Sequence, residues 1–246
     1  MSTASPLRHI WIFVLLAVAT AAGVAALPAL PQDPAYHQFA DARTVLGVPN
    51  GWNVLSNAPF LVVGLLGLAT CHRRSGHPAR VAWVIAFTGI GLVSLGSAWY
   101  HRSPSAAALV WDRLPMTIGF MGLLVAVLEP SIGGRASRLL LAPAVAVGLG
   151  SVAFWHWTGD LRPYVWVQFT PLLMIVAVLA LGPRRPGAVS LLGALLFYGA
   201  AKGLEAGDAA IHAASGGLIA GHAVKHLFAA LACLLLVRVF RDATAG

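Results

Sequence analysis

The stretch Arg80–His101 reads RVAWVIAFTGIGLVSLGSAWYH. Between its first arginine and its last histidine, about 20 residues carry no charge, which is the length that an α-helix needs to cross the hydrocarbon core of a bilayer. The stretch ends in Ser97-Ala98-Trp99-Tyr100-His101. Ser97 and His101 lie four residues apart and share one helix face. Since polar side chains are costly within a span and usually functional, the stretch predicts a transmembrane helix that carries part of a site.

Similar apolar runs recur along the whole chain. Of its 246 residues, 59% are hydrophobic and only 10% are charged, which is too apolar for a soluble protein of this size. The fold class predicted is therefore an all-α polytopic membrane protein. We expect eight spans, at residues 9–30, 51–71, 80–101, 105–128, 138–157, 163–182, 188–210 and 218–238.

The first span and the segment after it form a separate part of the sequence. Residues 1–31 predict an N-terminal transmembrane helix or signal anchor, and its length favours a retained helix over a cleaved signal peptide. Residues 32–50 then form a polar segment. The remaining spans lie within residues 51–241.

The net charge of +8 does not indicate a nucleic-acid partner, because the basic residues lie in short loops between spans. Ten arginines lie in the N-terminus, the C-terminal tail and the loops after spans two, four and six: Arg8, Arg73, Arg74, Arg80, Arg135, Arg138, Arg184, Arg185, Arg238 and Arg241. The opposite loops carry three: Arg43, Arg102 and Arg162. The positive-inside rule then places both termini in the cytoplasm if span one is retained.

Three histidines fall at similar depth in this topology, near the outer leaflet. His101 ends span three, and His222 and His226 lie four residues apart at the start of span eight. Each alone could be a histidine bonded to a backbone carbonyl or a lipid headgroup. Together they can hold a zinc ion and leave its fourth position open.

Asp112 lies about two turns into span four, where a lone carboxylate needs a partner. Its neighbour Arg113 is a poor one, because adjacent helix residues do not face each other. We expect Asp112 to accept a proton from water activated by the metal. Ser97 could join this chemistry or bond back to its own helix turn. Lys202 and Glu205 favour an ion pair three residues apart, with lining of the site as the alternative.

These residues resemble the alkaline ceramidases, within a wider superfamily of seven-helix membrane hydrolases and adiponectin-receptor-like proteins. The resemblance rests on Ser97-x-x-x-His101, Asp112 followed by Leu114-Pro115-Met116, and His222-x-x-x-His226. It also includes Trp52-Asn53-Val54-Leu55-Ser56-Asn57. It covers roughly residues 41–238.

The resemblance implies a seven-helix transmembrane core, spans two to eight, with span one as an additional N-terminal helix. It further implies that His101, His222 and His226 bind zinc, that Asp112 helps to deprotonate water, and that Ser97 steadies the oxyanion or water. The expected reaction is hydrolysis of the N-acyl bond of ceramide-type membrane lipids.

One departure concerns calcium. Where eukaryotic members place a calcium-binding glutamate and an aromatic residue, this chain has Asn50 and Gly51. Asp41, Asn50 and Asn53 remain for a calcium or other polar site, and the sequence gives calcium little support.

Other functions remain open at this stage. The same zinc chemistry could cleave another lipid amide or ester, or the fold could bind lipid as a receptor or sensor. An ion pathway through Asp112, Lys202 and Glu205 ranks last, because the inner halves of the spans look apolar. The sequence does not decide the oligomeric state.

Overall fold

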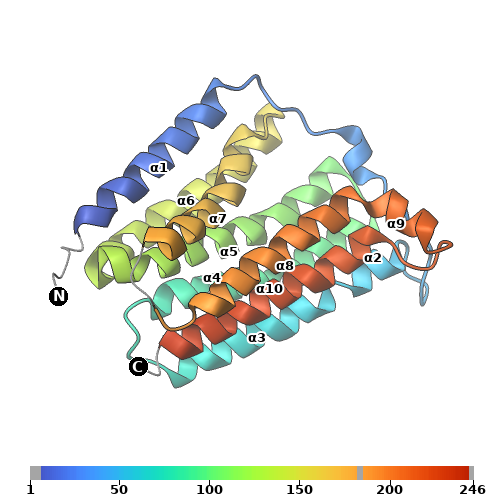
Figure 1. Ribbon diagram of the computed structural model, residues 1–246. Helices are drawn as coiled ribbons and strands as arrows, with labels where there is room; N and C mark the ends of the chain where they lie inside the picture. The colour runs from blue at the N-terminus through green and yellow to red at the C-terminus, as the bar shows by residue number, and fades with distance from the viewer. Residues whose placement is uncertain (1–6, 182–184, 244–246) are drawn as a thin grey trace.

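The computed structural model describes residues 7–181 and 185–243. Arg184, one of the arginines predicted to face the cytoplasm, and the first six residues of the predicted N-terminal segment lie outside these ranges. The described chain is a bundle of long helices lying side by side (Figure 1). Seven of the described helical segments are long and apolar enough to cross a membrane, which confirms the predicted multi-pass membrane fold.

The elements follow one another in chain order: α1 (Leu7–Ala26), the 3-10 helix η1 (Pro34–His37), α2 (Gly51–Leu55), α3 (Ala58–Arg73), α4 (Arg80–Arg102), α5 (Ala106–Ile132), α6 (Gly134–Thr158), α7 (Arg162–Leu181), α8 (Ala188–Ala206), α9 (Asp208–Ala214) and α10 (Gly221–Ala243). The additional N-terminal helix is present as α1, and its apolar stretch, Ile10–Ala26, is shorter than the seven others.

Two predicted spans are interrupted in the structure. Span two consists of α2 and α3, with Ser56 and Asn57 between them. Pro59 lies in the first turn of α3, where its missing N–H has no intrahelical partner to lose. Span seven was predicted to reach residue 210, but α8 ends at Ala206, and after Gly207 the short helix α9 starts. Both breaks lie at the same end of the bundle, which carries α2 and α9 (Figure 1). We refer to it as the site end.

Close helix packing aligns α4 and α5. A Cβ on Gly96 would lie 2.0 Å from the carbonyl oxygen of Trp111, so only glycine allows α4 to approach α5 at this level. Small residues permit such contacts between membrane helices. The contact brings Ser97 of α4 beside the turn of α5 that carries Asp112.

Helix α1 packs against α7, and the chain then crosses the site end to reach α2 (Figure 1). Asp160, in the turn before α7, accepts hydrogen bonds from the backbone N–H of Leu30 (3.2 Å) and from Arg162. The Arg162 guanidinium also donates to the carbonyls of Ala25 and Leu27. These bonds fix the start of residues 31–41, a segment that we call the strap.

Candidate metal centre

Three buried histidines converge at the site end. His101 lies in the last turn of α4, and His222 and His226 occupy the first two turns of α10. Their ligand nitrogens all lie within 4.8 Å of one another. In the described part of the chain, this is the one group of three or more His, Cys, Asp or Glu residues with such geometry.

The nitrogens of this cluster fit a metal ion. His101 Nδ1 and His222 Nε2 are buried with no hydrogen-bond partner among the described atoms, and a buried nitrogen without a partner is costly. A metal ion would satisfy both. Three imidazoles are a donor set typical of catalytic zinc, which keeps a fourth position open.

Second contacts orient the histidine rings. The Ser56 hydroxyl lies 2.8 Å from His226 Nδ1, which leaves Nε2 of that ring for a metal. Asn50 Nδ2 donates to the His101 carbonyl (2.9 Å). The ring of Phe39, from the strap, lies 4.8 Å from the His101 ring and 4.5 Å from the His222 ring. Of these contacts, the one from Ser56 to a ring nitrogen can set the tautomer of a ligand, whereas the other two position the backbone and the ring faces.

The start of α10 is held by α9. Asp208 Oδ1 accepts from the His222 backbone N–H at 2.8 Å, as an N-cap side chain does. Its second oxygen accepts from the Ala40 N–H of the strap (3.0 Å). A Cβ on Gly221 would lie 2.3 Å from the Leu204 carbonyl oxygen, so only glycine lets the start of α10 approach α8 this closely.

Asp112 and Ser97 face the same cavity as the histidines. The Asp112 side chain is 8% exposed and the Ser97 side chain 3%. Ser97 and Asp112 both line the polar cavity that contains the histidines. The structure therefore brings together the five residues that the sequence analysis selected for catalysis and metal binding.

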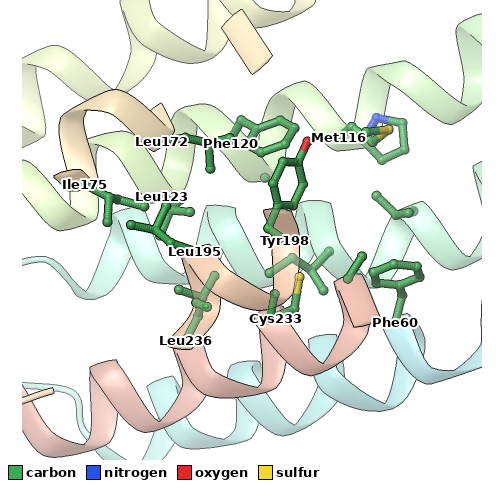
Figure 2. A pocket seen from close by; sticks show the side chains of 17 residues that line it. Phe60, Met116, Phe120, Leu123, Leu172, Ile175, Leu195, Tyr198, Cys233 and Leu236 are labelled. Atoms are coloured by element: carbon green, nitrogen blue, oxygen red, sulfur yellow. The ribbon is translucent and has the colours of Figure 1, made fainter. Parts of the chain in front are cut away.

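The cavity has a polar and an apolar part. The polar part, about 190 Å³, contains the histidines and Asp112. A second chamber of about 130 Å³ has an almost wholly apolar lining from α3, α4, α5, α7, α8 and α10. Phe60, Met116 and Tyr198 line both, so the two chambers are adjacent. Figure 2 shows Tyr198 beside Phe120 in this chamber, with Leu123, Leu195 and Leu236 further along its lining.

Lys202 and Glu205 form the expected ion pair, and both also line the polar cavity. Glu205 pairs as well with Lys225 of α10. Lys225 was not predicted to be a site residue, because it lies on another face of the helix than the histidines. Its placement in the cavity depends on the contact between α8 and α10.

The residues considered for calcium have other contacts. Asp41 forms an ion pair with Arg43 (2.5 Å), and the hydrogen bonds from this guanidinium lower the pKa of Asp41. Asn53 Nδ2 donates to the Asp41 carbonyl (3.0 Å), and Asn50 bonds to His101 as described above. These contacts connect the strap and α2 to the metal centre.

Phe39, Ser56, Asp208 and Arg113 contact the site or line its cavity but were not selected from the sequence. Ser56 is the one with a usable signal in the sequence, because it belongs to the Trp52–Asn57 motif at the start of span two. The others depend on tertiary contacts between distant segments.

Comparison with known proteins adds one finding. A family model described as Ceramidase matches residues 47–181, more than half of the chain. The match includes Ser97, His101 and Asp112 and ends before α8, so the association of His222 and His226 with them comes from the structure. A search of curated proteins finds no match. On the extent of the family match, the chain belongs to the ceramidase family.

Proposed function

We propose that the protein is a zinc-dependent intramembrane amide hydrolase that cleaves the N-acyl bond of ceramide-type lipids. The observation that carries the proposal is one cavity in which three histidines, Asp112 and Ser97 lie together, next to an apolar chamber. A polar reaction chamber beside an apolar one suits a substrate whose amide joins a polar head to an acyl chain.

His101, His222 and His226 would hold the zinc ion. When bound, zinc acts as a Lewis acid and lowers the pKa of water towards about 7.

Asp112 is the general base in this proposal. Its carboxylate accepts a proton as water attacks the amide carbon, and it returns a proton to the leaving amine as the C–N bond breaks. Ser97, which lines the same cavity, would steady the water or the oxyanion. The products are a free amine and a fatty acid, so protons and bonds balance without another reactant.

The apolar chamber accepts the acyl chain. Leu123, Leu195 and Leu236 supply side chains from three helices to its lining (Figure 2), and burial of each methylene contributes about 0.8 kcal/mol. Tyr198, shared by both chambers, marks the level at which the chain would meet the polar head.

The test combines metal analysis with hydrolysis of a ceramide panel by purified protein. We expect about one zinc per chain in the wild type, loss of zinc and activity in His222→Ala, and retention of zinc with about a 10²–10⁴-fold lower rate in Asp112→Asn. His72→Ala, an exposed histidine of α3, is the matched control and should keep both.

Loss of zinc from Asp112→Asn would make that residue a ligand and refute its role as base. A wild type that binds zinc but releases no fatty acid from any lipid amide or ester would favour lipid binding without turnover.

A further inference from the structure

Arg113 is a buried arginine in the same cavity, one residue beyond Asp112 on α5. Its side chain is 5% exposed. The guanidinium carbon lies 4.1 Å from the ring centroid of Trp155, 4.6 Å from that of Tyr164 and 5.8 Å from that of Tyr36. These rings come from α6, α7 and the strap, and they hold the guanidinium plane in place.

The donors of Arg113 are only partly used. Nη2 donates to Gln32 Oε1 at 2.6 Å, whereas Nη1 is buried and has no hydrogen-bond partner. Within residues 7–181 and 185–243, Arg113 forms no ion pair. Cation–π contacts stabilise a buried guanidinium, but they leave its N–H groups unsatisfied. An arginine this deep normally has an anionic partner.

Neither carboxylate that lines the cavity forms a direct ion pair with Arg113 in the described chain. Its lining includes three cations, Arg113, Lys202 and Lys225, and two carboxylates, Asp112 and Glu205. Glu205 is engaged by both lysines. The Asp112 carboxylate is near enough to act electrostatically on Arg113 but forms no ion pair with it. The cavity is therefore positively charged even before a metal cation binds, and an incoming anion would be attracted to it.

A carboxylate suits both the Arg113 site and the proposed reaction. Three aromatic rings surround the guanidinium, and Nη1 is the buried donor left without a partner. A carboxylate can approach a guanidinium in its plane, as in fork-shaped arginine–carboxylate pairs. The proposed hydrolysis itself releases a carboxylate into this cavity, which makes a carboxylate the anion to expect there.

We propose that Arg113 binds the carboxylate of a lipid in the cavity. This proposal rests on the proposed amide hydrolysis, and the lipid carboxylate has two possible sources. In one, the carboxylate belongs to the amine half of the substrate, beside the amide, as in an N-acyl amino acid. In the other, it is the fatty acid that hydrolysis releases. In either case Arg113 determines specificity and does not take part in the chemical step.

Matched lipid pairs with one acyl chain test the proposal. N-acylglycine and N-acylethanolamine differ by a carboxylate against a hydroxymethyl group, and fatty acid and fatty alcohol differ in the same way. The measurements are kcat/KM for the two amides, inhibition by the acid and the alcohol, and direct binding of all four lipids to purified protein.

If the substrate carries the carboxylate, the wild type should prefer N-acylglycine by about 10- to 100-fold, the range for a hydrogen bond to a charged group. If the fatty acid carries it, the same preference should appear as inhibition by the acid over the alcohol. In both cases Arg113→Met should abolish the preference, and Arg113→Lys should restore part of it, because lysine keeps the charge and loses the planar fork.

Two control variants separate binding from a structural role. Gln32→Ala removes the bond between Arg113 and the strap and should keep the preference. Arg102→Met removes an exposed arginine at the site end and should do the same.

The inference is refuted if the wild type shows no preference in either pair, or if Arg113→Met weakens both members of each pair equally. Direct binding of the four lipids can be measured even when none of them is hydrolysed. Failure of the proposed reaction and failure of the Arg113 site are therefore separate outcomes.

Discussion

Replacement of Gly221 by alanine tests whether the position of the start of α10 determines the geometry of the histidine cluster. The new Cβ would lie 2.3 Å from the Leu204 carbonyl oxygen and 3.0 Å from the Asp208 Cα. Neither atom belongs to a side chain that can rotate away. Restoring ordinary van der Waals contact requires the start of α10 to move by about 1 Å, and His222 is the next residue.

A displacement of this size can lower an enzyme's rate by about 10²-fold. We therefore expect Gly221→Ala to weaken zinc binding and to reduce hydrolysis by about that factor. The free energy of unfolding should fall by about 1–3 kcal/mol, the usual effect of an extra methyl group in a packed site. Zinc affinity by competition with a chelator, initial rates and thermal unfolding measure the three quantities.

Gly203→Ala is the matched control. A Cβ there meets no atom within 4 Å, and alanine is a better helix former than glycine, so zinc affinity should stay at the wild-type value. The double variant Gly221→Ala/Ile211→Ala removes the one side-chain clash, with Ile211 Cδ1 at 2.9 Å, and should not recover activity. Wild-type zinc affinity in Gly221→Ala would refute the reasoning.

Three further expectations concern other parts of the chain. Ser56→Ala removes the hydroxyl beside His226 Nδ1 and should weaken zinc binding about 10- to 100-fold, measured by the same chelator competition. Asp160→Asn should lower the melting temperature at neutral pH, because hydrogen bonds from Arg162 hold the pKa of Asp160 at about 2. This depressed pKa stabilises the fold above the unfolded value near 3.9, and the stabilisation disappears as pH falls through about 2. The difference from wild type should therefore shrink between about pH 4 and 2; a constant difference would show that the charge is irrelevant. For topology, cysteines placed at His77 and at the exposed Thr158 in a cysteine-free background should label from outside intact cells only at position 158, and the reverse pattern would invert the predicted orientation.

The three histidines, Ser97 and Asp112 could be selected from the sequence, but the residues that surround them could not. Helical spacing placed Ser97 with His101 and His222 with His226, because residues four apart share a helix face wherever the helix lies. Phe39 and Arg113 gave no such signal. Phe39 lies in a segment recognised only as polar, and Arg113 depends on aromatic rings from three segments distant in sequence.

The sequence by itself determined the membrane class and the main spans, and it singled out the three histidines, Ser97 and Asp112 as candidates, because apolar length and helical spacing are local properties of the chain. It did not determine the breaks at Ser56 and Gly207, since both lie within runs of mainly apolar residues. Tertiary structure alone decided that Asp208 holds α10, that Lys225 and Glu205 meet in the cavity, and that Nη1 of Arg113 has no partner. Each of these depends on contacts between separate helices or loops, whose packing is not encoded in any one segment.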